Sequence, residues 1–131
     1  MKVLVPVDGS DCSYRALEFA TEFVQRYEGE IHVVHVTDYE GESTEAIVER
    51  VRETLGEAGL TDSPEIVTDT RMSSPKYADR VGKDILRIAE DGEYDHVIMG
   101  HHGSGAVGRL ILGSASETVI RAAEVPTTVI P

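Results

Sequence analysis

Short apolar runs alternate with apolar residues at helical spacing along the whole chain. The run at residues 3–7 is continuous, as in a strand buried on both faces, and further strands are expected at residues 31–36, 65–70, 96–99 and 125–130. Between the runs, apolar residues recur every three or four positions, as on one face of a helix. The clearest such stripe consists of Ala16, Ala20, Phe23 and Tyr27. This alternation predicts a parallel sheet with helices on both faces.

Turn-forming residues mark the ends of four helices. The expected boundaries are Ser10 or Asp11 to Gly29, a stretch ended by Gly59, Ser74-Pro75 to Gly92, and Ser114 to about Ala123. The third run is polar and the fifth contains Pro126, so both are expected near the edges of the sheet. The chain of 131 residues has the size of one domain. We therefore expect a single doubly wound α/β domain over residues 1–131, with five parallel strands and four helices.

Ligands of such sheets bind beyond the carboxyl ends of the strands. The loop after the fourth strand is rich in glycine: five of the 12 glycines fall between Gly100 and Gly113. Glycine allows a ligand to approach the backbone closely, and the helix expected at Ser114 would offer free N–H groups to an anion. Capping-box spacing is also present from Ser114 to Glu117. A phosphate-binding turn is therefore favoured over a merely flexible one.

Several known motifs are absent. Gly108 to Ser114 resembles a P-loop in its glycine spacing but lacks the lysine that a P-loop requires. The first turn has only Gly9, which excludes a Rossmann dinucleotide fingerprint. No lysine follows Lys83, so the chain also lacks the last-strand lysine of a response-regulator receiver.

Asp8 comes directly after the first strand. It can accept a hydrogen bond from a base or ribose, or it can simply stabilise the turn. We favour the first interpretation because a phosphate-binding turn is expected at a neighbouring strand end.

The motifs Gly100-x2-Gly103-x9-Gly113-Ser114 and Val5-Pro6-Val7-Asp8-Gly9-Ser10 resemble the ATP-binding branch of the universal stress protein family, over the whole chain. The resemblance implies strand order 3-2-1-4-5. It implies that the main chain of Val36 recognises adenine, that Asp8 contacts base or ribose, and that phosphates with Mg²⁺ or Mn²⁺ lie near Gly113. It also implies a homodimer through Val125 to Ile130. The expected nucleotide-binding residues are Pro6, Val7, Asp8, Ser10, Val36, Met99, Gly100, His102, Gly103, Arg109, Gly113, Ser114 and Ala115.

Two segments depart from the family pattern. His101-His102 fills a position pair that usually ends in a single histidine, and the segment from Arg71 to Pro75 replaces a shorter turn that contains glycine. Neither change touches the glycine frame. Selectivity among ATP, ADP and AMP therefore stays open.

The chain is strongly acidic. It has 24 Asp and Glu against 12 Lys and Arg, for a formal net charge of −12, and this charge argues against nucleic acid and anionic membranes as partners. Only three of the basic residues are lysines, which favours adaptation to a salt-rich cytoplasm, an idea that unchanged stability in molar KCl would contradict. The N-terminus lacks a signal-peptide pattern, and no stretch approaches roughly 18 apolar residues. We therefore expect a cytoplasmic location.

Cysteine and histidine offer little chemistry of their own. Cys12 has no second cysteine to pair with and is read as a small buried residue. His32 and His35 should point to opposite faces of a strand, and His101 and His102 also diverge, so no structural metal site is expected.

The leading hypothesis is an ATP-binding regulatory or stress-response module with little turnover. One alternative is a slow metal-dependent ATPase that uses Asp8, or an enzyme that phosphorylates itself at Ser114 or Ser116. Another is a protein-interaction scaffold that has lost the ligand.

Overall fold

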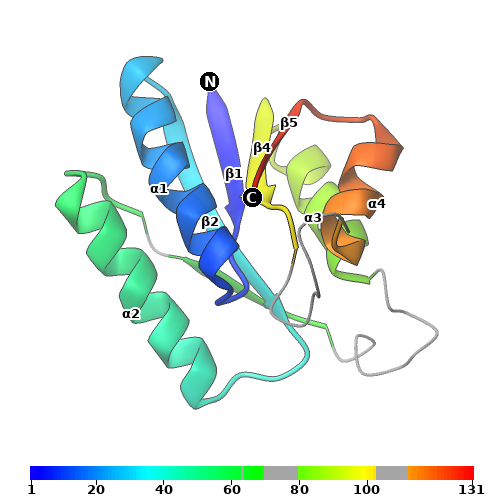
Figure 1. The fold of residues 1–131 in the computed structure, drawn as a ribbon, viewed down its shortest axis with the longest axis horizontal. Coiled ribbons are helices and arrows are strands. Elements are labelled where there is room, and N and C mark those ends of the chain that lie inside the picture. The colour runs from blue at the N-terminus through cyan, green and yellow to red at the C-terminus, as the bar shows by residue number, and fades with distance from the viewer. Residues whose placement is uncertain (63, 70–79, 103–111) are drawn as a thin grey trace.

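A computed structural model describes residues 1–62, 64–69, 80–102 and 112–131, and it contains one parallel sheet of five strands (Figure 1). The strand order is β3-β2-β1-β4-β5, so β1 lies at the centre. The strands are β1 (Lys2–Pro6), β2 (Glu30–Thr37), β3 (Glu65–Thr68), β4 (His96–Gly100) and β5 (Thr127–Ile130). The predicted doubly wound fold and strand order are confirmed, and β3 and β5 are the two edges.

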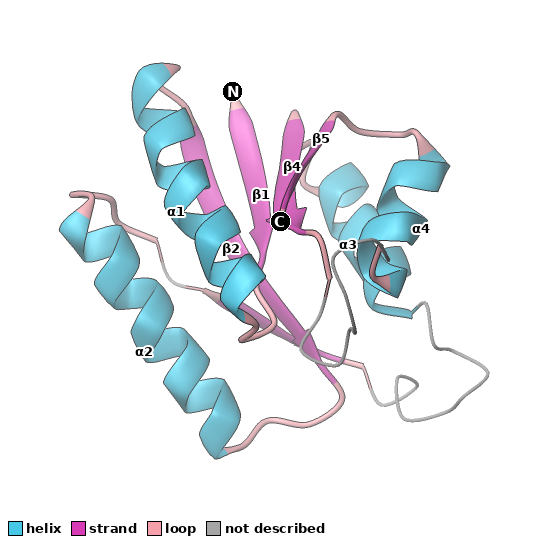
Figure 2. Ribbon diagram, viewed as in Figure 1, coloured by secondary structure: helices cyan, strands magenta, loops and turns pink. Residues whose placement is uncertain are grey.

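Helices cover both faces of this sheet. They are α1 (Asp11–Arg26), α2 (Glu42–Glu57), α3 (Arg80–Asp91) and α4 (Ser114–Ala122). As Figure 2 shows, α1 and α2 lie on one side of the strands and α3 and α4 on the other. Val3 and Val5 pack in the core beneath α1 and α2, whereas Leu4 packs in the core beneath α3 and α4. Neighbouring strand residues thus enter opposite cores, which explains the unbroken apolar run from Val3 to Val7.

The ends of the elements differ from the sequence prediction by a few residues. Helix α1 begins after the predicted cap, because the Ser10 hydroxyl accepts a hydrogen bond from the Ser13 N–H. It ends at Arg26, before Gly29, and α2 ends at Glu57, before Gly59. Strands β3 and β5 are shorter than predicted. The predicted start of α3 at Ser74-Pro75 lies outside the described residues.

Helix α4 has a different cap from the one its sequence suggests. Gly113, and not Ser114, is the N-cap residue, and Glu117 N–H donates to the Gly113 carbonyl at 2.9 Å. The predicted capping box, which needs Ser114 at the cap, is therefore not formed. The shift leaves Ser114 as the first helical residue.

Candidate functional site

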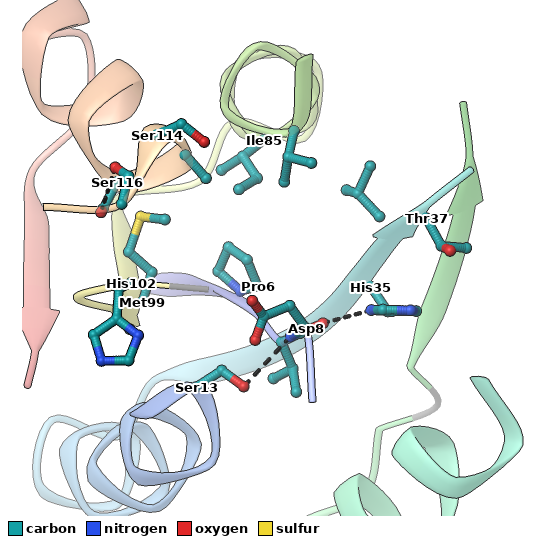
Figure 3. A pocket seen from close by; sticks show the side chains of 16 residues that line it. Pro6, Asp8, Ser13, His35, Thr37, Ile85, Met99, His102, Ser114 and Ser116 are labelled. Atoms are coloured by element: carbon teal, nitrogen blue, oxygen red, sulfur yellow. Dashed lines mark hydrogen bonds between the residues drawn. The ribbon is translucent and has the colours of Figure 1, made fainter. Parts of the chain in front are cut away.

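A cavity of about 330 Å³ opens at the carboxyl end of the sheet, between the ends of β1 and β4. This is the point where the strand order reverses, and a volume of this size is typical of small-molecule sites. Figure 3 shows side chains of β1, β2, α3 and the start of α4 around it. Its lining residues are Pro6, Val7, Asp8, Ser13, His35, Val36, Thr37, Val81, Ile85, Met99, Gly100, His102, Gly113, Ser114, Ala115 and Ser116.

The main chain of Val36 faces this cavity because β1 ends early. The Val7 N–H donates to the Val34 carbonyl at 2.8 Å, and the β1–β2 register ends at Pro6 and Val34. Backbone groups two residues apart on a strand point to the same side. Val36 therefore turns its N–H and carbonyl toward β1 at a level where β1 has already become a loop.

A buried histidine fixes that loop. His35 Nδ1 lies 2.7 Å from the Val7 carbonyl oxygen, so Nδ1 carries the hydrogen and donates it. The bond holds the last residue of the β1 run in place beyond the end of the ladder. His35 thereby positions the chain that leads into Asp8.

Asp8 uses one carboxylate oxygen to shape the turn. Its Oδ1 accepts hydrogen bonds from the Ser10 N–H at 2.9 Å and from the Ser10 hydroxyl at 2.5 Å. Gly9, between them, has a φ of +89°, which favours glycine. The turn-stabilising interpretation of Asp8 is thus realised in the structure. Asp8 is exposed and also lines the cavity, and its contact with a base or ribose stays a prediction.

Ser10 was expected to bind nucleotide, but it does not line the cavity. Its side chain is 7% exposed, and its hydroxyl is occupied by Asp8 and by the cap of α1. The local sequence could not separate a capping serine from a ligand-binding one.

The start of α4 supplies N–H donors. Gly113 N–H donates to the His101 carbonyl at 2.9 Å, so the helix begins beside the end of β4. Ser114, Ala115 and Ser116 follow as its first turn, and all three line the cavity. First-turn N–H groups have no partner within their helix and favour an anion.

Of the two serines proposed for self-phosphorylation, Ser114 is exposed. Ser116 is 1% exposed, and its hydroxyl lies 2.8 Å from the His101 carbonyl and 3.1 Å from the Gly113 carbonyl. This hydroxyl is a donor used inside the protein. The geometry favours Ser114 over Ser116 as an acceptor of any transferred group.

Cys12 is buried, as predicted, and it joins α1 to the segment after β4. Its thiol donates to the His102 carbonyl at 2.8 Å, and Sγ lies 3.9 Å from His102 Nδ1.

The nearby Tyr14 has a pKa raised by burial and, more weakly, by Asp8 and Asp11, with Arg50 acting in the opposite direction. Tyr14 therefore stays neutral beside the Asp8 turn at ordinary pH.

Ten of the thirteen predicted residues line the cavity. Gly103 and Arg109 lie outside the described residues, and Ser10 is turned away into the cap of α1. Sequence reasoning missed Ser13, His35, Thr37, Val81, Ile85 and Ser116. Val81 and Ile85 had a signal, the apolar stripe of the third helix, but such a stripe cannot distinguish a cavity wall from a filled core.

In the described part of the chain, no group of three or more His, Cys, Asp or Glu side chains is arranged to hold a metal ion. None of the helices in these ranges is long and apolar enough to cross a bilayer.

The fold and cavity define a doubly wound α/β domain with a cavity at its topological switch point. The chain belongs to the universal stress protein family, whose model matches residues 1–131. It is 34% identical to a Thermus aquaticus universal stress protein, over 98% of this chain and 96% of that one. It is 26% identical to the universal stress protein MJ0531 of Methanocaldococcus jannaschii, over 98% and 81% of the two chains.

Solved structures agree with this assignment. The structure of MJ0577, a universal stress protein of the same archaeon, has a TM-score of 0.78 and 26% identity, covering 98% of this chain and 94% of that one. The Archaeoglobus fulgidus universal stress protein in complex with dAMP has a TM-score of 0.73 at 19% identity, covering 100% and 98% of the two chains. A universal stress protein in complex with cAMP has a TM-score of 0.75 at 20% identity, covering 100% and 96%. The last two show likeness of fold.

Proposed function

We propose that this protein binds an adenine nucleotide in the cavity between β1 and β4 and acts as a nucleotide-responsive regulatory module. The observation that carries the proposal is the cavity itself, which joins an apolar wall to the N-terminus of α4. The complexes of two related folds with dAMP and cAMP support the adenine nucleotide class.

The base would lie in the apolar part of the cavity. Val81 and Ile85 of α3 and Met99 of β4 line this part. The main chain of Val36 offers a donor and an acceptor at the edge of this region, which suits the amino group and ring nitrogens of a purine. Asp8 would contact the base or the ribose.

The phosphates would lie at the first turn of α4. Ser114 is the first helical residue and the exposed one of the three that line the cavity there. A divalent ion would be held mainly by the phosphate oxygens and water, as is usual for Mg²⁺, with Asp8 as the carboxylate in the lining. When bound, the ion would neutralise phosphate charge.

A proline at Ser114 gives a sharp test. Proline is compatible with the first helical position, and Gly113 already has φ −65° and ψ 156°, a conformation favoured before proline. Ser114→Pro removes one N–H donor while α4 stays formed, whereas Ser114→Ala removes only the hydroxyl. We expect calorimetric titration with MgATP to show binding about tenfold weaker for the proline variant, the loss of one charge-assisted hydrogen bond, and unchanged binding for the alanine variant. Equal affinity of the proline variant and wild type would contradict the phosphate site.

The enzymatic alternative is tested on the same proteins. Sustained metal-dependent release of phosphate from ATP that is lost in Asp8→Ala would favour an ATPase. Incorporation of labelled phosphate that is lost in Ser114→Ala would favour self-phosphorylation. We propose slow or absent turnover, because a regulatory module needs only different affinities in its two states.

We further propose a cytoplasmic homodimer, formed through the exposed edge of β5. Parallel strands leave an unpaired row of backbone groups at such an edge.

A further inference from the structure

Two buried carboxyl groups lie beside one arginine where β3 ends and α3 begins. Asp69 is 7% exposed and Asp84 is 1% exposed. Arg80 Nε lies 2.9 Å from Asp69 Oδ2 and 4.0 Å from Asp84 Oδ1. The second cation, Arg87, reaches Asp84 Oδ1 at 3.5 Å, and its side chain is 57% exposed. The partly buried Arg80 guanidinium thus contacts two buried carboxylates.

One oxygen of Asp84 lacks a hydrogen-bond partner among the described residues. This oxygen, Oδ2, is buried, an arrangement that is costly for an ionised carboxylate. Protonation turns this carboxyl group into a donor, and the neighbouring Asp69 carboxylate, which contacts the same Arg80 Nε, can accept the hydrogen bond. The geometry fits one proton shared by the pair.

The surroundings of Asp84 favour the protonated form. Burial raises the pKa of Asp84, as do hydrogen bonding of its protonated form to Asp69 and the charge of Asp69, whereas Arg80 and Arg87 lower it. Helix α4 and strand β2 pack on α3 through uncharged residues. Helix α4 meets α3 through Ala115 and Thr118, and its Glu117 and Arg121 pair with each other at 2.9 Å. Strand β2 shares a core with α3 through Val34 and Val36.

The pair connects two walls of the cavity. Val81 and Ile85 lie on α3 beside Asp84, and both line the cavity. The Asp69 N–H donates to the carbonyl of Thr37 at 2.8 Å, and Thr37 lines it from β2. Figure 3 shows Ile85 and Thr37 on these two walls. If Asp69 and Asp84 moved apart, the two walls of the cavity formed by α3 and β2 would move apart as well.

We propose that a proton shared by Asp69 and Asp84 holds α3 against the end of β2 and thereby couples nucleotide binding to pH. Release of the proton to solvent leaves two adjacent carboxylates beside Arg80, and their repulsion moves α3 away from Thr37. The inference rests on the proposed nucleotide site.

The test compares nucleotide affinity at several pH values in three proteins. Asp84→Asn keeps the shape of the side chain and supplies a permanent N–H donor to Asp69, so it imitates the protonated state. Asp91→Asn, at the exposed end of the same helix, is the matched control for loss of one charge. Calorimetric titration with MgATP would be run from about pH 5 to about pH 8, where buried carboxyls with a raised pKa titrate. Titration of the nucleotide phosphate affects all three proteins equally.

We expect affinity to fall as the pH rises in wild type and Asp91→Asn, by a factor within the roughly 5- to 150-fold range of allosteric coupling. Asp84→Asn should keep the low-pH affinity throughout. Parallel curves for all three proteins would overturn the proposal.

A second measurement tests the proposal even if Asp84→Asn fails to fold or no nucleotide binds. Carbon-13 NMR of the Asp84 carboxyl in wild type reports its protonation directly, and by reciprocity MgATP should raise its pKa. An Asp84 that titrates like the exposed aspartates would refute the shared proton even if Asp84→Asn failed to fold. Normal proton sharing with no nucleotide binding at any pH would instead refute the nucleotide site alone.

Discussion

Gly100 lies where the end of β4 touches the first turn of α1. A Cβ atom placed there would lie 2.8 Å from Cys12 Sγ and 3.0 Å from the Ser13 backbone nitrogen. The sequence suggested that this glycine lets a ligand approach the backbone. In the structure its absent side chain first lets the helix approach, and that approach brings Ser13 to the cavity.

Substitution at this position should therefore destabilise the fold. We expect Gly100→Ala to lower the free energy of unfolding by about 1–3 kcal/mol, the usual cost of overpacking, because the contacted nitrogen belongs to the helix backbone. At Gly56, near the end of α2, an added Cβ would meet no atom within 4 Å, so Gly56→Ala should raise stability by up to about 1 kcal/mol. Urea unfolding measures both. The same sign for both variants would contradict this account of Gly100.

At the scale of elements, His32 joins β2 to the residues around the start of β3. Its Nδ1 lies 3.2 Å from Asp62 Oδ1, and its Nε2 lies 3.0 Å from Glu65 Oε2. Asp62 also accepts a hydrogen bond from the Val33 N–H through Oδ2 at 2.9 Å. These contacts hold the edge strand at the end of the sheet opposite to the cavity.

This link should make stability depend on pH. The hydrogen bond with Asp62 and the neighbouring Glu65 raise the pKa of His32 from 6.5 to about 9, although burial acts to lower it. A base with a raised folded pKa stabilises fully below its unfolded pKa, so the contribution is complete below pH 6.5 and is lost as the pH rises through about 9. After allowance for the exposure of Glu65, we expect His32→Gln to cost roughly 1–2 kcal/mol at low pH and little at high pH. Urea unfolding over this range measures the difference.

His96, on β4, should change stability with pH in the opposite direction. Burial lowers its pKa, so its neutral form is favoured in the fold, and its contribution is lost as the pH falls below 6.5. A constant difference between wild type and His32→Gln across the whole range would show that His32 acts without its charge.

At the scale of the whole molecule, we propose that two copies assemble through the edge strand β5. The carbonyls of Pro126 and Ile130 accept hydrogen bonds from the N–H groups of Val97, in β4, and His101, directly after it. The backbone of Val129, at the alternate position, therefore faces outward. A second copy could pair with this row of backbone groups.

Proline at Val129 would remove the outward N–H in the middle of this edge. We expect Val129→Pro to be a monomer by light scattering at concentrations where wild type is a dimer, because a paired strand cannot accept proline there. Val129→Ala keeps the N–H and should stay dimeric, although it loses some packing. A dimeric proline variant would place the interface elsewhere.

The sequence by itself determined the fold class and the order of strands and helices along the chain, because alternating periods are local patterns. The strand order within the sheet and most of the residues around the cavity followed from the family resemblance that the two motifs carry. Only the tertiary structure decided the role of each residue in capping, packing or lining the cavity. Ser10 caps α1, Gly100 lets the same helix approach β4, and Val81 and Ile85 line the cavity, although their sequence contexts resemble those of ligand-binding or core residues. The pairing of Asp69 with Asp84 was likewise invisible, because it depends on where the end of β3 meets α3. Contacts between residues distant in the chain follow from packing, which local periodicity does not specify.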